Sequence, residues 1–157
     1  MLLRLGEKDL SVSLVWKRAS KNERNTDALH CCMSTPLILE NFIYGVDNYG
    51  ELRCLDLLTG NRIWEDLSAV KSDRWANIHF IQNDTYTYMF NEHGELIIAN
   101  LSGQGYHEID RAKLIEPTTG QLNRNGVGVT WAHPAFAYKH VFVRSDKELL
   151  CADLSEK

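Results

Sequence analysis

The 157-residue chain has few of the features that mark membrane proteins or nucleic-acid-binding proteins. No stretch approaches the roughly 18 consecutive apolar residues that a membrane-spanning helix needs. Seventeen lysine and arginine residues stand against 21 aspartate and glutamate residues, which gives a net charge of −4 without a basic run. Such a charge balance provides no electrostatic attraction for nucleic acid or an anionic membrane. We therefore expect no membrane span and no nucleic-acid partner.

Signals for export and motifs of the common enzyme classes are also missing. Charged residues interrupt Met1–Glu7 too early for the apolar core of a signal peptide, so we expect no export signal in this chain. The sequence has no glycine-rich phosphate loop, no H-E-x-x-H and no G-x-S-x-G. We assign no catalytic residue, and an enzymatic activity is uncertain but not favoured.

Only four cysteines are present, and none belongs to the separated C-x-x-C pairs that structural zinc sites use. Cys54 and Cys151 occupy the same position of an internal repeat and are interpreted as small buried apolar residues. Neighbouring cysteines such as Cys31 and Cys32, with His30 beside them, can close a strained ring, but an ordinary structural role is favoured. We expect no metal site and no cofactor.

The dominant positive feature of the chain is internal repetition. Residues 43–57 return without a gap as 87–101, with a shift of 44 from Gly50 to Gly94, and 141–154 is a third copy with a shorter turn. Each copy places two apolar runs around a polar turn, a pattern typical of a β-hairpin. Repeats of about 40 to 50 residues built from such units predict the blades of a β-propeller.

Short apolar runs around each hairpin extend the copies to four strands. We predict one all-β domain over 1–157, a β-propeller segment of about three four-stranded antiparallel blades with 12 or 13 strands and almost no helix. The predicted parts are a half-blade at 1–17, full blades at 33–66 and 75–110, and a three-stranded blade at 131–154. Residues 18–29 and 111–130 are expected to be long loops on a binding face, or linker-like segments.

One copy carries a family resemblance. The stretch from Cys54 to Trp64, CLDLLTGNRIW, resembles the repeat of PQQ-type propellers, in which a small residue, Leu and Asp precede Thr-Gly and then Trp. The other copies depart from it: Asn100 replaces the aspartate, Ser102-Gly103 stands one place early, and Glu108 is aligned with the tryptophan. The resemblance is to the PQQ-like β-propeller repeat proteins of the quinoprotein alcohol dehydrogenase-like superfamily. It implies that the tryptophan packs between neighbouring blades.

From this resemblance we expect a set of blade-packing residues, namely Trp16, Trp64, Asp56 and Gly60. The family, bacterial and often exported or periplasmic, includes quinone-dependent dehydrogenases and non-enzymatic scaffolds, so its fold alone does not decide function. In the dehydrogenases a ring of adjacent cysteines stacks on the quinone, but no matching cation ligands or aspartate base surround Cys31-Cys32. We interpret the chain as a non-catalytic scaffold for protein–protein interaction. The alternatives are a fragment or subunit of a PQQ-dependent oxidoreductase, and a truncated product without a role of its own.

Two further expectations concern the channel and the ends. His79 and His133 share the repeat position before the innermost strand, where they could face each other and help to bind an anion or a metal. The other interpretation is that they hydrogen-bond the backbone at the blade edge. Because outer strands come first and inner strands last, we expect unpaired edges that a protein partner or a second copy completes. An open arc within a longer chain is the alternative.

Overall fold

The prediction of an all-β propeller segment is confirmed. The computed structural model describes residues 1–20, 22–121 and 128–155, and these residues form strands and connecting segments without a helix. Consequently, none of the described residues belongs to a helix that could span a membrane. Fifteen strands are present in this part of the chain, more than the 12 or 13 expected.

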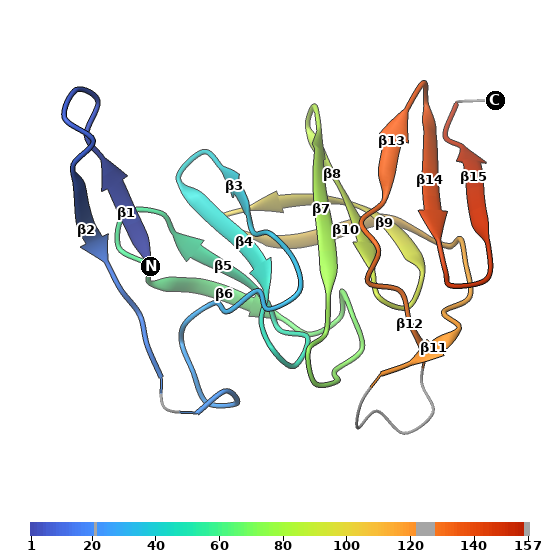
Figure 1. Cartoon of the computed structure of the whole chain (residues 1–157), viewed down its shortest axis with the longest axis horizontal. Helices are drawn as coiled ribbons and strands as arrows, with labels where there is room; N and C mark the ends of the chain where they lie inside the picture. The colour runs from blue at the N-terminus through green and yellow to red at the C-terminus, as the bar shows by residue number, and fades with distance from the viewer. Residues whose placement is uncertain (21, 122–127, 156–157) are drawn as a thin grey trace.

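Two sheets have four antiparallel strands whose spatial order follows the sequence, as in a propeller blade (Figure 1). The first sheet contains β3 (Leu37–Leu39), β4 (Phe42–Val46), β5 (Leu52–Asp56) and β6 (Arg62–Asp66). The second sheet contains β7 (Ile78–Asn83), β8 (Tyr86–Asn91), β9 (Glu95–Ser102) and β10 (Gly105–Lys113).

A shorter sheet stands at each end of this pair (Figure 1). The N-terminal hairpin consists of β1 (Leu2–Leu5) and β2 (Val12–Trp16), and the third sheet consists of β13 (Ala135–Ala137), β14 (His140–Arg144) and β15 (Leu149–Asp153). Neither set reaches four strands, so each leaves sheet edges without a neighbouring strand among the described residues.

The segment expected to be a long loop from 111 to 130 is partly strand. Strand β10 continues to Lys113, which pairs with Glu95, so it runs three residues into the predicted loop. A two-residue ladder between β11 (Thr119–Gly120) and β12 (Gly128–Val129) comes next along the chain. The rest of the predicted loop, residues 122–127, lies outside the described residues.

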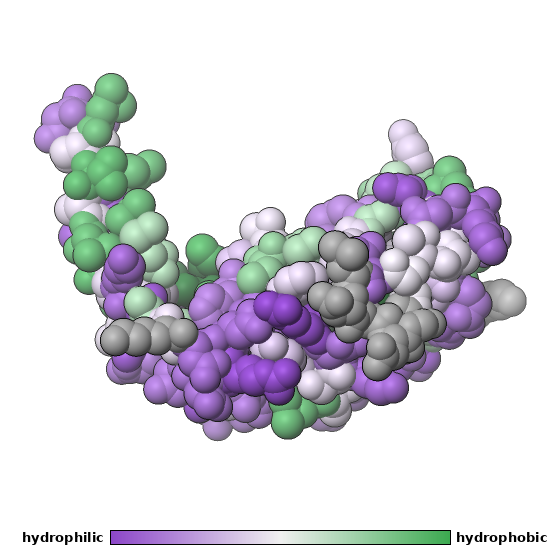
Figure 2. All heavy atoms as spheres, turned by 60° about the horizontal axis from the view of Figure 1, so that its bottom comes forward, coloured by the Kyte–Doolittle hydropathy of each residue, from purple (hydrophilic) through white to green (hydrophobic). Residues whose placement is uncertain are grey.

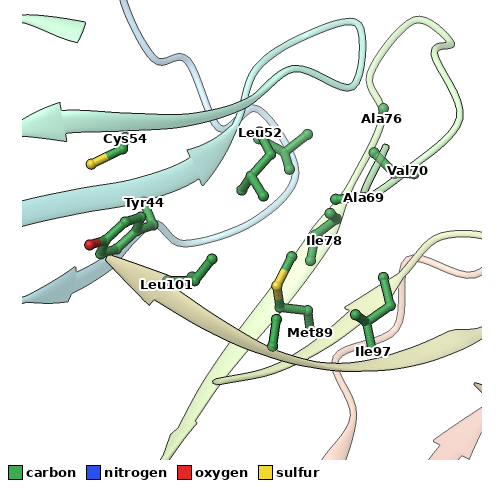
Figure 3. Close-up of a cluster of buried hydrophobic side chains, with 12 residues drawn as sticks. Tyr44, Leu52, Cys54, Ala69, Val70, Ala76, Ile78, Met89, Ile97 and Leu101 are labelled. Atoms are coloured by element: carbon green, nitrogen blue, oxygen red, sulfur yellow. The ribbon is translucent and has the colours of Figure 1, made fainter. Parts of the chain in front are cut away.

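The core lies between sheets: the first sheet packs one face on the second, and the second packs one face on the third. We call the face toward the next sheet the leading face and the opposite one the trailing face. Tyr44, Leu52 and Cys54 on the leading face of the first sheet meet Met89 and Ile97 on the trailing face of the second, and all five are at most 1% exposed (Figure 3). A second cluster joins the second and third sheets in the same way. The alternation of side chains along each strand therefore supplies two separate apolar faces.

A β-bulge recurs at one place in three hairpins and sets the register of the strand beyond it. The ladders skip Val15, Ile63 and Ile109, and the next residue in each strand then pairs with the preceding strand. These pairs are Leu2 with Trp16, Cys54 with Trp64, and Ile98 with Asp110. The alignment of Glu108 with the tryptophan is therefore wrong: Asp110 stands at the position of Trp64, because Asp110 follows its partner Ile98 by 12 positions, whereas Trp64 follows its partner Cys54 by 10.

Trp16 and Trp64, the tryptophans that follow this bulge, both contact the next sheet. The Trp16 indole N–H donates to the carbonyl of Leu57 at 2.8 Å, and the Trp64 indole N–H donates to the carbonyl of Ser102 at 2.8 Å. The acceptors lie at the β5–β6 and β9–β10 turns, respectively. Each indole thus spans from one sheet to a turn of the next one.

The turn that receives Trp16 is shaped by the other two residues of the predicted packing set. The Asp56 carboxylate accepts hydrogen bonds from the backbone N–H and the hydroxyl of Thr59, both at 2.7 Å. These bonds to the charged form lower the pKa of Asp56. Gly60 has a φ of +69° and lies directly under the indole, since a Cβ there would be 2.6 Å from the Trp16 ring. How much these contacts stabilise the packing of the sheets remains a prediction.

We expect Gly60→Ala to lower the free energy of unfolding by about 1 to 3 kcal/mol, because the new Cβ meets the indole and the backbone is left-handed. Gly120→Ala is the matched control, since no atom lies within 4 Å of a Cβ at that position. Urea unfolding followed by far-UV circular dichroism measures both variants. Equal stability of the two variants would show that Trp16 does not pack against this turn in solution.

Candidate functional site

The structure brings His79 and His133 together where β7 faces the segment that leads into β13. Their ring centroids are 4.5 Å apart, and His79 is 6% exposed while His133 is exposed. Nε2 of His79 lies 3.1 Å from the carbonyl oxygen of Trp131, and Nδ1 of His133 lies 2.8 Å from that of Pro134. Both histidines thus contact backbone carbonyls, whereas a ligand held between them remains a prediction.

Burial favours the neutral form of His79. Burial lowers the pKa of His79 below its ordinary value of 6.5, and repulsion from a positive charge on His133 lowers this pKa further. A neutral ring has no charge with which to attract an anion. Among the residues that the structure describes, no group of three or more His, Cys, Asp or Glu side chains is arranged to hold a metal ion.

Glu92 is a buried residue of this region that the sequence analysis did not single out. It is 0% exposed, and its carboxylate accepts a hydrogen bond from the Trp131 indole at 3.0 Å. The backbone N–H of Thr130 donates to the Glu92 carbonyl at 2.7 Å. The equivalent position of the preceding repeat is Asn48, also buried. A polar residue at the same turn position in two copies was the signal available in the sequence.

The segment around the adjacent cysteines is anchored by buried charges. Asp47 pairs with Arg53, whose Nη1 also donates to the carbonyl of Ala28 at 2.6 Å. Nδ1 of His30 lies 2.7 Å from the Asp47 carboxylate. Arg53 is only 3% exposed, and its Nε lies 2.7 Å from a carboxylate oxygen of Glu65. This network fastens the chain before β3 to the trailing face of the first sheet.

The two thiols themselves are free. Burial, with the nearby charge of Asp47, raises the pKa of Cys31 to about 12, and the same two causes raise the pKa of Cys32. The Cys32 thiol donates to the side-chain oxygen of Asn48 at 2.7 Å. A nucleophilic or metal-binding thiolate is disfavoured at both positions, because the thiolate is the reactive form.

The trailing face of the N-terminal hairpin is an exposed apolar surface. It carries Leu3 paired with Leu14 and Leu5 paired with Val12, and these side chains are 43 to 70% exposed. Figure 2 shows the hairpin standing clear of the other sheets, with much of its surface hydrophobic. By the shared bulge, Leu3 is equivalent to Ala99, which is 0% exposed at the interface between the first and second sheets. The hairpin therefore presents a packing face that no described residue covers.

The leading face of the third sheet is exposed in a complementary way. Leu149 is 73% exposed, whereas the equivalent Leu52 and Leu96 are 0% and 4% exposed beneath the next sheet. On the same face, Cys151 is exposed and pairs with the half-buried Phe142. The two ends of the array thus expose opposite halves of one kind of interface.

Comparisons with known proteins add little to this geometry. No protein-family model matches the chain, and a search of curated proteins finds no match. Among solved structures, one described as "The crystal structure of BamB from Moraxella catarrhalis" is similar, with a TM-score of 0.48 and 17% sequence identity. The similarity covers 74% of this chain and 30% of that one, so the chain spans less than a third of the length of that protein.

Lowering the pH through the ordinary pKa of histidine should reduce the free energy of unfolding, in part through His79. Its pKa is depressed in the folded chain, so below about pH 6.5 the unfolded state takes up a proton that the folded state does not. We expect His79→Gln to show a smaller loss of stability between pH 7.5 and 5.5 than the unmodified chain, measured by urea unfolding. His107→Gln, at an exposed position of β10, should leave the loss unchanged. An identical pH profile for His79→Gln would contradict the burial of a neutral imidazole.

Proposed function

We propose that the chain is a non-catalytic β-propeller module of the PQQ-like type, whose role is to bind protein through its two exposed end faces. The observation that supports this is the exposure of opposite halves of one interface, Leu3 and Leu5 at one end and Leu149 at the other. Apolar side chains that are buried at every internal sheet interface are unfavourable in water when left uncovered.

The occupant that fits these faces best is a second copy of the chain. A leading face in this molecule packs on a trailing face, and each copy has one of each exposed. Two copies related by a two-fold axis would bury both pairs of faces at once and leave no exposed end. Each copy contributes the hairpin and the first, second and third sheets, so the ring would contain eight sheets, at the upper end of the range of four to eight blades that closes a propeller.

The free sheet edges also favour contact with another chain. Strand β15 has no neighbour on its outer side among the described residues, and β1 and β2 pair only with each other. Unpaired edge strands are templates for pairing with another chain. Protein partners other than a second copy would meet the same two faces and edges.

Light scattering after size-exclusion chromatography should therefore give twice the mass of the 18.0 kDa chain. Leu5→Glu on the trailing face and Leu149→Glu on the leading face should each give monomers, because a carboxylate would be buried in both copies of the contact. Leu58→Glu is the control, since Leu58 is 66% exposed on the β5–β6 turn, away from both faces.

A mixture of the two monomeric variants makes the test specific. One pairing in such a mixture brings the intact leading face of the Leu5→Glu chain onto the intact trailing face of the Leu149→Glu chain. We expect the mixture to form a weak heterodimer that neither variant forms alone. An unmodified chain that remains monomeric at about 100 µM, where a specific interface of micromolar Kd would be occupied, overturns the proposal.

A further inference from the structure

The interface between the second and third sheets lacks an aromatic ring that its counterpart contains. Between the first and second sheets, the centroid of the Trp64 ring lies 5.9 Å from that of the Tyr44 ring, and the indole N–H donates a hydrogen bond to the carbonyl of Ser102. Tyr88 is the repeat equivalent of Tyr44, and Ser155 is the equivalent of Ser102. The position of Trp64 itself is taken by Asp110, which is exposed.

A hollow of about 770 Å³ has both Tyr88 and Ser155 in its lining. Tyr88 contributes to its wall from the second sheet, and Phe136 and Leu154 contribute from the third, all three belonging to the apolar cluster between these sheets. Asn83, Lys139 and Ser155 add polar groups to the lining. The hollow therefore continues an established interface at the level where an indole fills the neighbouring one.

The walls of the hollow are suited to an aromatic ring. The Tyr88 and Phe136 rings are 5.4 Å apart, and the Tyr88 hydroxyl accepts a hydrogen bond from the Asn83 amide at 3.0 Å, which orients it. Tyr138, 95% exposed, lies at the rim on a turn where both it and Lys139 have a left-handed φ, of 51° and 58°.

We propose that this hollow binds a tryptophan side chain presented by an extended segment of a partner protein. The chemistry of the occupant is taken from the molecule, since Trp16 and Trp64 make the equivalent contacts at the two preceding turns. The indole would stack against Tyr88 and Phe136, and its N–H would donate to the backbone carbonyl of Leu154 or Ser155. This site is separate from the two end faces, so its occupation does not depend on self-association.

The test uses fluorine NMR of a short peptide that contains one 5-fluorotryptophan, added to the full chain. We expect the fluorine resonance to shift and broaden with increasing protein, and Tyr88→Ala to weaken binding about three- to tenfold, the contribution of an aromatic pair. Tyr49→Ala is the matched control, because Tyr49 is a half-buried tyrosine of the first sheet that bonds Glu23. Failure of the unmodified chain to shift the resonance overturns the proposal.

Filling the hollow from within provides a second, independent variant. Since Ile98 stands where the first sheet has the smaller Cys54, the variant combines Ile98→Cys with Asp110→Trp and so copies the row of Cys54 and Trp64. The internal indole should abolish peptide binding, whereas Ile98→Cys alone should retain it.

Undiminished binding by the double variant would place the peptide elsewhere and overturn the proposal. Binding of free 5-fluoroindole without binding of the peptide would also overturn it, because the hollow would then accept a small molecule and not a protein segment. The oligomeric state of each variant, measured in parallel, separates this site from the end faces.

Discussion

The packing of one sheet face on the next is the interaction on which the whole molecule depends. The second sheet is apolar on both faces and packs between two neighbours, and the clusters around Tyr44 and Phe90 are two instances of the same contact. Among the described residues, both apolar clusters join adjacent sheets, as expected for an array in which each unit contacts only its neighbours. An apolar sheet face consequently stabilises the fold where a neighbouring sheet covers it, and it is an exposed binding surface where no sheet covers it.

Trp16 and Trp64, which follow the same bulge in their strands, show how local structure joins one sheet to the next. A bulge re-aims the strand after Ile63, and the indole of Trp64 then reaches a backbone carbonyl that belongs to the next sheet. Where Asp110 stands at the equivalent position no such hydrogen bond forms, and a hollow remains between the second and third sheets. The difference between a structural contact and a candidate binding site here is one side chain at one register position.

The repeats predicted the fold well, because apolar runs mark the buried strands and polar residues mark the turns between them. The pattern predicted the strands around Gly50 and Gly94, but it did not predict the continuation of β10 to Lys113, since the exposed residues of that strand have no apolar alternation. The misplacement of the tryptophan position at Glu108 has a related cause: the longer strands of the β9–β10 hairpin and the position of its bulge are features of the backbone, which a residue-by-residue alignment does not contain.

The residues of the candidate sites were harder to predict from the sequence. Sequence position alone brought His79 and His133 to one strand entrance, and their rings do lie together. Arg53 and Glu92 could not be recognised as buried, because their burial depends on segments distant in sequence, at Ala28 and at Trp131. A hollow between two sheets forms where one copy lacks a large side chain that fills the same position in another copy. A repeat alignment identifies that position only when the strand register is known.

The attachment of the N-terminal hairpin has a dynamic consequence. Its contacts with the first sheet include the Trp16 indole on the β5–β6 turn and Arg18 beside Asn61. Such a small set of contacts can separate without disturbing the cores between the other sheets, so the hairpin forms a cooperative unit of its own with a low opening free energy. Amide hydrogens of β1 and β2 would then exchange with solvent far sooner than those of β8 and β9, and the hairpin would be free to leave one neighbour and dock on another while the remaining sheets stay folded.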